Sequence, residues 1–271
     1  MRREDSEMLR VLNVEKTFNK GTINEKRALN GLNLELQDGD FVTVIGGNGV
    51  GKSTMLNVIA GVYPIDRGQI ILHGENISTW PEHKRARFEG RVFQDPMKGT
   101  AANMQIQENL AMAYRRGLKR GLKWAITKEE HARYHEALKT LNLGLEDRMT
   151  AKVGLLSGGQ RQALTLLMAT LRKPELLLLD EHTAALDPKT SAKVLELTRQ
   201  IVEENKLTTL MITHNMKDAI RMGNRLVMMH EGRIIYQASG EEKEHLQVSE
   251  LLEKFEQAAG DAFANDRMIL G

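Results

Sequence analysis

Cysteine is absent from this chain of 271 residues, and so is any long apolar run. Without cysteine there can be no disulfide framework and no thiolate metal site, which is consistent with a reducing compartment. A membrane-spanning helix needs roughly 18 apolar residues, and no segment approaches that length. Residues 1–7 mix acidic with basic side chains and lead into no apolar segment, so we expect no signal peptide. We therefore expect a soluble chain that meets a membrane only through partners.

A strong charge of one sign is also missing. The sequence has 38 Lys and Arg against 36 Asp and Glu, which gives a formal net charge of +2. Such a balance provides no general attraction to nucleic acid, so any basic surface must be local. Because 41% of the residues are hydrophobic, the chain can form one large compound domain with a real core.

One local basic run stands out in the middle of the chain. Its cations recur at spacings of three and four beside Trp124, which predicts one basic helical face. The residues are Arg115, Arg116, Lys119, Arg120 and Lys123. Two interpretations remain open for this face: a solvated surface, or contact with anionic lipid headgroups or an acidic partner.

The chain is, by contrast, rich in glycine at one place, directly after the apolar run 41–45. A strand that leads through a glycine-rich turn into a helix is the P-loop arrangement, in which backbone N–H groups converge on phosphate oxygens. Lys52 supplies a charge for the β- and γ-phosphates, and the Ser53 hydroxyl is a hard ligand for Mg²⁺. The sequence therefore predicts binding of a nucleoside triphosphate with Mg²⁺ by Gly46, Gly47, Asn48, Gly49, Val50, Gly51, Lys52, Ser53 and Thr54.

Two carboxylates follow a second apolar run, 176–179, that we expect to be a buried strand. A helix at 189–205 and a strand at 209–213 come next, so the sheet is at least partly parallel. Asp180 would lie at the carboxyl end of its strand, where open α/β sheets bind ligands, and can share the Mg²⁺ of Ser53. Glu181 is predicted to polarise water for hydrolysis; the alternative is a surface acid.

The remaining pattern predicts short elements on both sides of these motifs. Alternating apolar residues predict half-buried antiparallel strands at 9–14 and 32–36. Further segments are a helix at 52–60, strands at 68–72, 91–96, 225–230 and 234–236, a short helix at 218–222 and an amphipathic helix at 248–255.

A five-residue motif, Leu-Ser-Gly-Gly-Gln at 156–160, is identical to the signature of the ATP-binding cassette (ABC) family. Together with the segment 176–181 and His214, it makes the chain resemble the cassette subunit of an ABC transporter over about residues 9–240. The resemblance implies an α/β fold: a P-loop NTPase core with a mostly parallel sheet, an antiparallel β subdomain and an α-helical signature subdomain at about 95–161. We expect a nucleotide-binding domain at 1–240 and a C-terminal helical extension at 241–271.

The resemblance also implies roles for individual residues. Gln94 resembles the glutamine that links the Mg²⁺ site to the membrane subunit, although it could be a turn residue. His214 resembles the histidine that contacts the γ-phosphate, although a lone histidine is usually a satisfied surface or core residue. Phe18 resembles the aromatic that stacks on adenine, or it belongs to the core. Residues 185–187, ending in Asp187, resemble the D-loop.

The signature motif has a physical reading of its own. Ser157 is a good helix N-cap, and Gly158 and Gly159 leave the first N–H groups of the following helix uncovered. This is a second anion site, beyond the one that a single P-loop provides. The family packs two cassettes head to tail around two ATP, so we expect a homodimer in which Ser157, Gly158, Gly159 and Gln160 complete the site of the other copy.

His182 departs from the family pattern, which generally has Pro or Ala after the glutamate. One hypothesis is that His182 lies near the dimer interface and makes hydrolysis sensitive to pH between about 5.5 and 7.5 through its own titration. The alternative is that it is a spacer.

The resemblance implies an ATPase that drives transport through a separate integral membrane permease, at the cytoplasmic face of the plasma membrane. A single cassette without membrane spans resembles bacterial importers, which also use an extracytoplasmic substrate-binding protein. The segments 180–188 and 228–232 resemble a subgroup that takes up amino acids, including aromatic ones. The alternative is an ABC ATPase that acts on nucleic acid or ribosomes. Those usually carry two cassettes or a coiled-coil insertion, so we expect no nucleic-acid partner. A small-molecule kinase is disfavoured by the signature.

Overall fold

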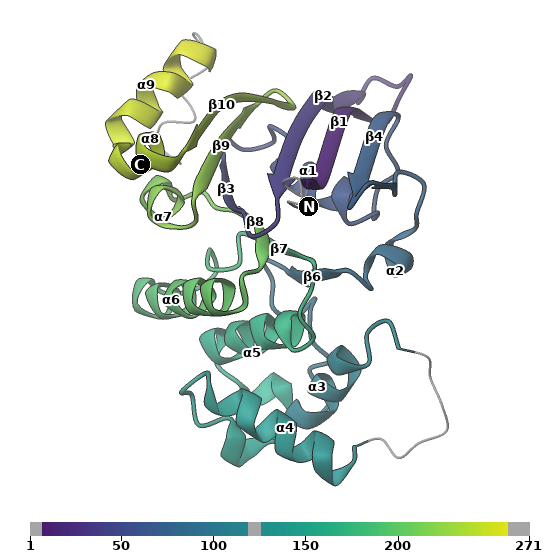
Figure 1. Ribbon diagram of the computed structural model, residues 1–271, viewed down its shortest axis with the longest axis vertical. Coiled ribbons are helices and arrows are strands. Elements are labelled where there is room, and N and C mark those ends of the chain that lie inside the picture. Colours follow the sequence, from purple (N-terminus) through teal and green to yellow (C-terminus); the bar gives the residue numbers. More distant parts are fainter. Residues whose placement is uncertain (1–6, 119–125, 260–271) are drawn as a thin grey trace, which may run out of the picture. The chain divides into compact units, whose positions relative to one another are not determined.

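The computed structural model describes residues 7–118 and 126–259, which form two compact units (Figure 1). The first unit comprises the described residues up to Arg85 and from Thr208 onwards. Its elements are β1 (Glu7–Phe18), β2 (Lys26–Gln37), β3 (Phe41–Ile45), α1 (Lys52–Ile59), β4 (Arg67–Leu72), β5 (Glu75–Asn76), α2 (Glu82–Arg85), β8 (Thr208–Ile212), α7 (Met216–Arg221), β9 (Arg225–His230), β10 (Arg233–Ser239), α8 (Gly240–His245) and α9 (Val248–Ala259).

The second unit, Ala86–Leu207, is mostly helical. It contains β6 (Glu89–Val92), α3 (Ile106–Tyr114), α4 (Lys128–Lys139), α5 (Gly158–Thr170), β7 (Leu176–Asp180) and α6 (Pro188–Asn205), with two short 3₁₀ helices at Glu146–Arg148 and Val153–Leu155. The predicted signature subdomain at about 95–161 falls inside this unit. None of the helices in the described ranges is both long and apolar enough to span a membrane.

The first unit carries two kinds of sheet. Strands β2, β1, β4 and β5 pair antiparallel in that order, and the predicted strands 9–14 and 32–36 lie within the longer β1 and β2. Strand β3 lies between β8 and β9 and pairs parallel with both, and all five of its residues are buried, as expected for a strand covered on both faces. In the second unit β6 and β7 are also parallel. The predicted α/β fold class is confirmed.

Helix α1, which follows the glycine-rich loop, is closed at its C-terminal end by a buried arginine. The Arg85 guanidinium, 2% exposed, donates to the carbonyls of Val58 and Ile59 at 2.8 and 2.6 Å. A cation at the end of a helix satisfies carbonyls that have no intrahelical partner and complements the helix dipole. Arg85 therefore fixes the end of the helix that begins at the predicted phosphate site.

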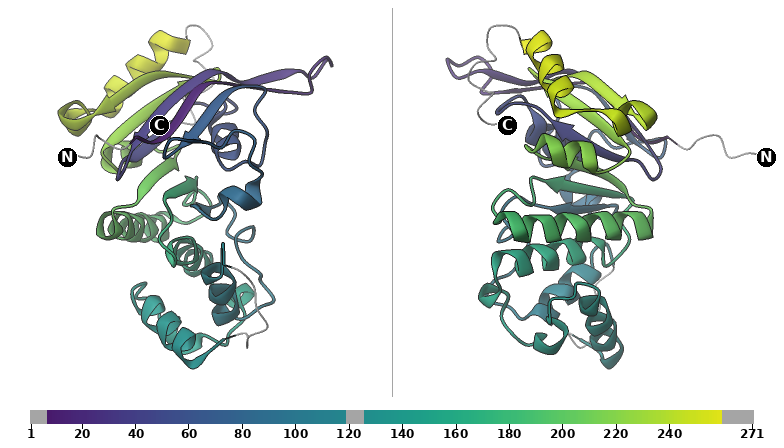
Figure 2. Two further views of the ribbon diagram at one scale, coloured as in Figure 1. Left: turned by 45° about the vertical axis from the view of Figure 1, so that its right-hand side comes forward. Right: turned by 90° about the vertical axis from the view of Figure 1, so that its left-hand side faces the viewer.

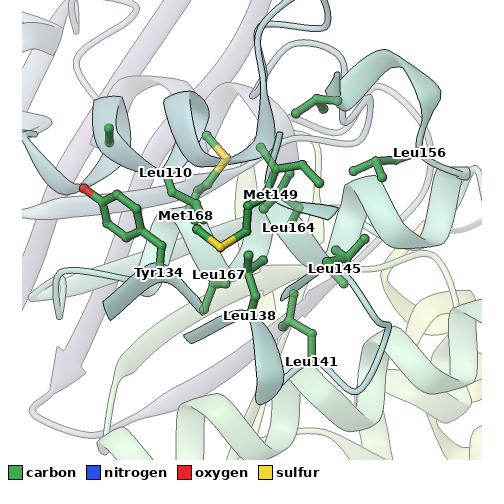
Figure 3. Close-up of a cluster of buried hydrophobic side chains, with 14 residues drawn as sticks. Leu110, Tyr134, Leu138, Leu141, Leu145, Met149, Leu156, Leu164, Leu167 and Met168 are labelled. Carbon is green, nitrogen blue, oxygen red and sulfur yellow. The ribbon is translucent and has the colours of Figure 1, made fainter. Parts of the chain in front are cut away.

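The core of the second unit is a cluster of leucine, methionine and tyrosine side chains from its helices (Figure 3). Tyr134 and Leu138 lie one turn apart on the same face of α4, and both are fully buried. They meet Leu110 of α3 and Leu164 and Leu167 of α5. Helix α5, which begins at the signature motif, is thus held along its length by apolar packing.

The C-terminal helices pack on their own chain. Figures 1 and 2 show α9 running beside β9 and β10, and Leu251 and Phe255 of α9 are buried against Met216 of α7. Lys243 of α8 is 3% exposed and donates to three carbonyls at the end of α7, those of Ile220, Met222 and Gly223. Burial lowers the pKa of Lys243 to about 8. The apolar face of the predicted helix 248–255 is therefore covered within this subunit.

The prediction of one basic helical face is wrong for the described part of that run. Helix α3 ends at Tyr114, so Arg115 and Arg116 lie in the turn that follows it. Arg115 pairs with Glu130 at 3.0 Å, and Arg116 donates to the carbonyls of Ala169 and Arg172. Both cations serve internal contacts. The other members of the run, Lys119, Arg120, Lys123 and Trp124, lie outside the described residues.

Candidate functional site

The predicted phosphate loop runs from the end of β3 to the start of α1. Lys52, only 5% exposed, points its Nζ back into the loop and donates to the carbonyls of Gly46 and Gly47, both at 2.7 Å. Ser53 is exposed in the first turn of α1. The loop thus presents a helix start, a held ammonium and an accessible hydroxyl at one place, which is the donor set that a triphosphate with a hard cation requires.

Two glycines of this loop have no room for a side chain. A Cβ on Gly46 would stand 2.3 Å from the carbonyl oxygen of Met229, and a Cβ on Gly51 would stand 2.3 Å from that of Ala28. Both glycines have positive φ, +148° and +108°. The loop is also bonded to the turn between β9 and β10, where the Gly232 N–H donates to Val50 O at 2.9 Å. Neighbouring strands therefore fix the path of the loop.

His214 and the loop lie at the same edge of the sheet in the first unit. The parallel register pairs Val44 of β3 with Ile212 of β8, and each strand ends within one residue of this pair. Gly46 and His214 each lie two residues beyond this pair, so the register places them side by side at the carboxyl ends of the two strands. Asn215 then caps α7 by accepting from the Asp218 N–H at 3.1 Å.

Phe18, the predicted adenine platform, ends β1 and is half-buried. Its ring meets the Tyr63 ring edge to face, with centroids 5.2 Å apart, and the Lys16 Nζ lies 5.5 Å from its centroid. The ring is therefore held by neighbours while part of it stays accessible, which is compatible with stacking on a base.

Three other predicted site residues, Gln94, Asp180 and Glu181, lie in the second unit. Strands β6 and β7 pair Val92 with Leu179, so Gln94 and Glu181 come level with each other two residues beyond the pair. Asp180 is the last residue of β7 and is half-buried. Glu181 has a left-handed backbone, φ 47°, which is uncommon for a residue with a side chain and costs conformational free energy.

The signature motif and the predicted D-loop lie side by side in the second unit. Ser157 caps α5, its Oγ accepting from the Gln160 N–H at 3.3 Å, while Gln160 Oε1 accepts from the Ser157 N–H at 3.1 Å. Asp187 caps α6 by accepting from the Thr190 N–H at 3.1 Å, and hydrogen bonds from Thr190 lower its pKa. A Cβ on Gly159 would stand 2.2 Å from Thr190 Cγ2. Gly159 therefore also allows the two helix starts to approach each other.

Reasoning from the sequence misses two residues of α5 that bond to the backbone near Gln94 and near the signature motif. Gln162 on α5 is 1% exposed, and its Nε2 donates to the carbonyl of Phe93, the neighbour of Gln94, at 3.3 Å. Arg161 donates to the carbonyl of Gly154, just before the signature, and to that of Leu156, the first residue of the signature. A polar residue on the otherwise apolar face of a predicted helix was the only signal for Gln162.

The hypothesis that His182 titrates between about pH 5.5 and 7.5 is wrong. His182 is 2% exposed, and its Nε2 lies 2.9 Å from the hydroxyl of Thr198 on α6. That hydroxyl donates its own proton to Val194 O, so it accepts from an Nε2–H of the neutral ring. Burial lowers the pKa of His182 to about 4. His182 therefore connects the turn at Glu181 to α6 through a buried hydrogen bond and stays neutral through that pH range.

This burial makes stability depend on pH in a definite direction. Between about pH 6.5 and 4 the unfolded state binds a proton that the folded state does not, so stability is complete above pH 6.5 and falls on acidification. When the pH falls from 7 to 5, the free energy of unfolding of the wild type should decrease by about 2 kcal/mol more than that of His182→Gln, a variant that keeps a hydrogen-bond donor for Thr198. Melting temperatures at the two pH values measure this. The exposed His83→Gln is the control, and an equal loss in all three proteins would contradict the prediction.

Comparison with protein families and sequences gives consistent matches. A family model described as ABC transporter matches residues 29–184. The chain is 45% identical over 251 residues to the tyrosine transport ATP-binding protein of Clostridioides difficile, covering 93% of this chain and all of that protein. It is 32% identical to the spermidine/putrescine import ATP-binding protein PotA of Haemophilus influenzae, of which it spans 60%.

Solved structures agree with these matches. A dimeric ATP-binding cassette in a post-hydrolysis state, bound to ADP and Pi, is similar with a TM-score of 0.74 and 28% identity, covering 86% of this chain and 98% of that one. CbiO1 of Clostridium perfringens, part of the ABC transporter complex CbiONQ, has a TM-score of 0.74 and 27% identity, covering 94% of this chain and 96% of that chain.

Proposed function

Because the chain belongs to the ABC transporter family and is an ATPase of its ATP-binding cassette type, we propose that it drives the import of an aromatic amino acid through a separate membrane permease. The observation that carries the substrate class is the 45% identity to a tyrosine transport ATP-binding protein over that protein's whole length. The permease, with an extracytoplasmic substrate-binding protein, would select the amino acid, and the cassette would supply the ATP-driven step from the cytoplasmic face.

The proposal gives each predicted site residue a role. The N–H groups of the loop 46–54 and Lys52 would hold the phosphates, while Phe18 stacks on adenine. Ser53, which is exposed at the start of α1, and Asp180 at the end of β7 carry hard oxygen ligands of the kind that Mg²⁺ prefers, and Gln94 would add an amide oxygen. Mg²⁺ would neutralise charge on the phosphates.

Hydrolysis and dimerisation would use the residues of the second unit together with His214. Glu181 would orient the attacking water, and His214 would contact the γ-phosphate. Two copies would enclose two ATP, each signature helix start completing the site of the other copy through Ser157, Gly158, Gly159 and Gln160, with Asp187 alongside. Hydrolysis would then open the dimer, a two-state change that a permease can use.

Uptake measurements in the host cell test the substrate class. Deleting the gene is expected to abolish most saturable uptake of labelled tyrosine at low concentration and to leave spermidine uptake unchanged. Expression of the wild type restores uptake, whereas Glu181→Gln does not. Unchanged uptake of tyrosine, phenylalanine and tryptophan in the deletion strain would contradict the proposal. A loss of spermidine uptake alone would show that the substrate is a polyamine instead.

A further inference from the structure

The hairpin of β1 and β2 brings a lysine to the phosphate loop. Lys26 is the first residue of β2, and the Lys26 Nζ lies 3.1 Å from the position that a Cβ on Gly49 would occupy. Gly49 is at the middle of the loop and has a φ of +72°. The ammonium group therefore lies directly against the backbone that is expected to hold phosphate oxygens.

The register of the hairpin connects this lysine to the predicted adenine platform. Phe18 and Lys26 are directly paired across the two antiparallel strands. Side chains of directly paired residues project from the same face of a sheet, so Phe18 shares the face from which Lys26 reaches Gly49. The hairpin thus carries an aromatic group and a cation on one face, next to a phosphate loop, in the arrangement that a nucleotide requires.

The charge of Lys26 has no counterpart in the part of the chain that the structure describes. The next residue, Arg27, lies on the opposite face of the hairpin and pairs with Glu15 at 3.0 Å. Lys26 has neither an ion pair nor a side-chain hydrogen bond among the described residues, although it is exposed and close to a loop that already contains the Lys52 ammonium. Two cations beside one loop repel each other until an anion lies between them.

We propose that Lys26 is a second phosphate-binding cation, which binds the triphosphate from the β1–β2 hairpin while Lys52 binds it from the phosphate loop. The proposal rests on the proposed ATP site and adds a residue to it. A charge-assisted hydrogen bond to phosphate is stronger than a neutral one. Because Lys26 is exposed, its contact weakens with salt more than that of the buried Lys52.

Calorimetric titration of the whole protein with ATP and Mg²⁺ tests the proposal. We expect Lys26→Met to raise the Kd for ATP by about 10-fold at low salt and by less at high salt, since the lost contact is screened there. Lys26→Arg keeps the charge and should bind within about threefold of the wild type. Arg27→Met, which removes the neighbouring cation from the opposite face, is the matched control and should also stay within about threefold.

The possible results separate the new proposal from the function on which it rests. A Kd for Lys26→Met within twofold of the wild type would overturn the role of Lys26 alone. Equal weakening in Lys26→Met and Arg27→Met would also overturn it, because the cause would then be loss of hairpin structure. Only a wild type that binds no ATP would overturn the proposed ATP site itself.

Discussion

The Glu181→Gln variant is expected to hydrolyse ATP at least about 100-fold more slowly than the wild type, with little change in ATP affinity. Glutamine has the size of glutamate but cannot accept a proton from water, and a positioned general base contributes about 10²- to 10⁴-fold. Glu181 follows the last residue of β7 and has a left-handed backbone, whereas Asp180 still belongs to the strand. Steady-state phosphate release and equilibrium ATP binding give the two measurements.

A neighbouring acid provides the control for this prediction. Glu175 precedes β7 at the opposite end of the strand, so Glu175→Gln should leave the rate of hydrolysis within about twofold of the wild type. A Glu181→Gln rate within tenfold of the wild type would show that another group activates the water. A large loss of ATP affinity would instead assign Glu181 to binding.

The Gly51→Ala variant is expected to lose ATP binding by at least about 100-fold, because the loop cannot keep its path. The added Cβ would stand 2.3 Å from Ala28 O and 3.2 Å from Leu29 Cδ2, and both neighbours belong to β2. The φ of +108° is a second obstacle for any residue with a side chain. Titration with ATP and a melting curve would be recorded together.

Gly39→Ala separates the collision from the backbone strain. Gly39 also has a positive φ, +81°, but a Cβ there would meet no atom within 4 Å. We expect this control to cost about 1–2 kcal/mol of stability and to bind ATP normally. If Gly51→Ala binds ATP as well as Gly39→Ala does, the loop tolerates displacement and its fixed path is not needed for binding.

The features that could be predicted from the sequence are those that local chemistry determines. The strand at 41–45, the turn of glycines and the helix from Lys52 follow one another in the chain, and the structure has them within about one residue of the predicted bounds. Ser157 as an N-cap is equally local, since cap and capped N–H groups lie within three residues. The fold class follows from the order of such segments.

The features that were missed depend on contacts between distant segments. The sequence predicts an ordinary titration for His182 because nothing local shows that α6 covers it and that Thr198 accepts a hydrogen bond from it. The spacing of the basic run predicts a helical face, but α3 ends at Tyr114 and Arg115 pairs with Glu130. The place of Lys26 against Gly49 needs the register of β1 with β2 and the packing of β2 on the loop.

The central claim is that ATP joins two copies of this cassette, and light scattering of Glu181→Gln with and without ATP and Mg²⁺ tests it most directly. The variant should bind ATP without consuming it, so a closed dimer should accumulate. The account predicts the mass of one chain, 30.5 kDa, without nucleotide and twice that mass with ATP and Mg²⁺. A mass of one chain at a saturating ATP concentration, with ATP shown to be bound, would contradict the claim.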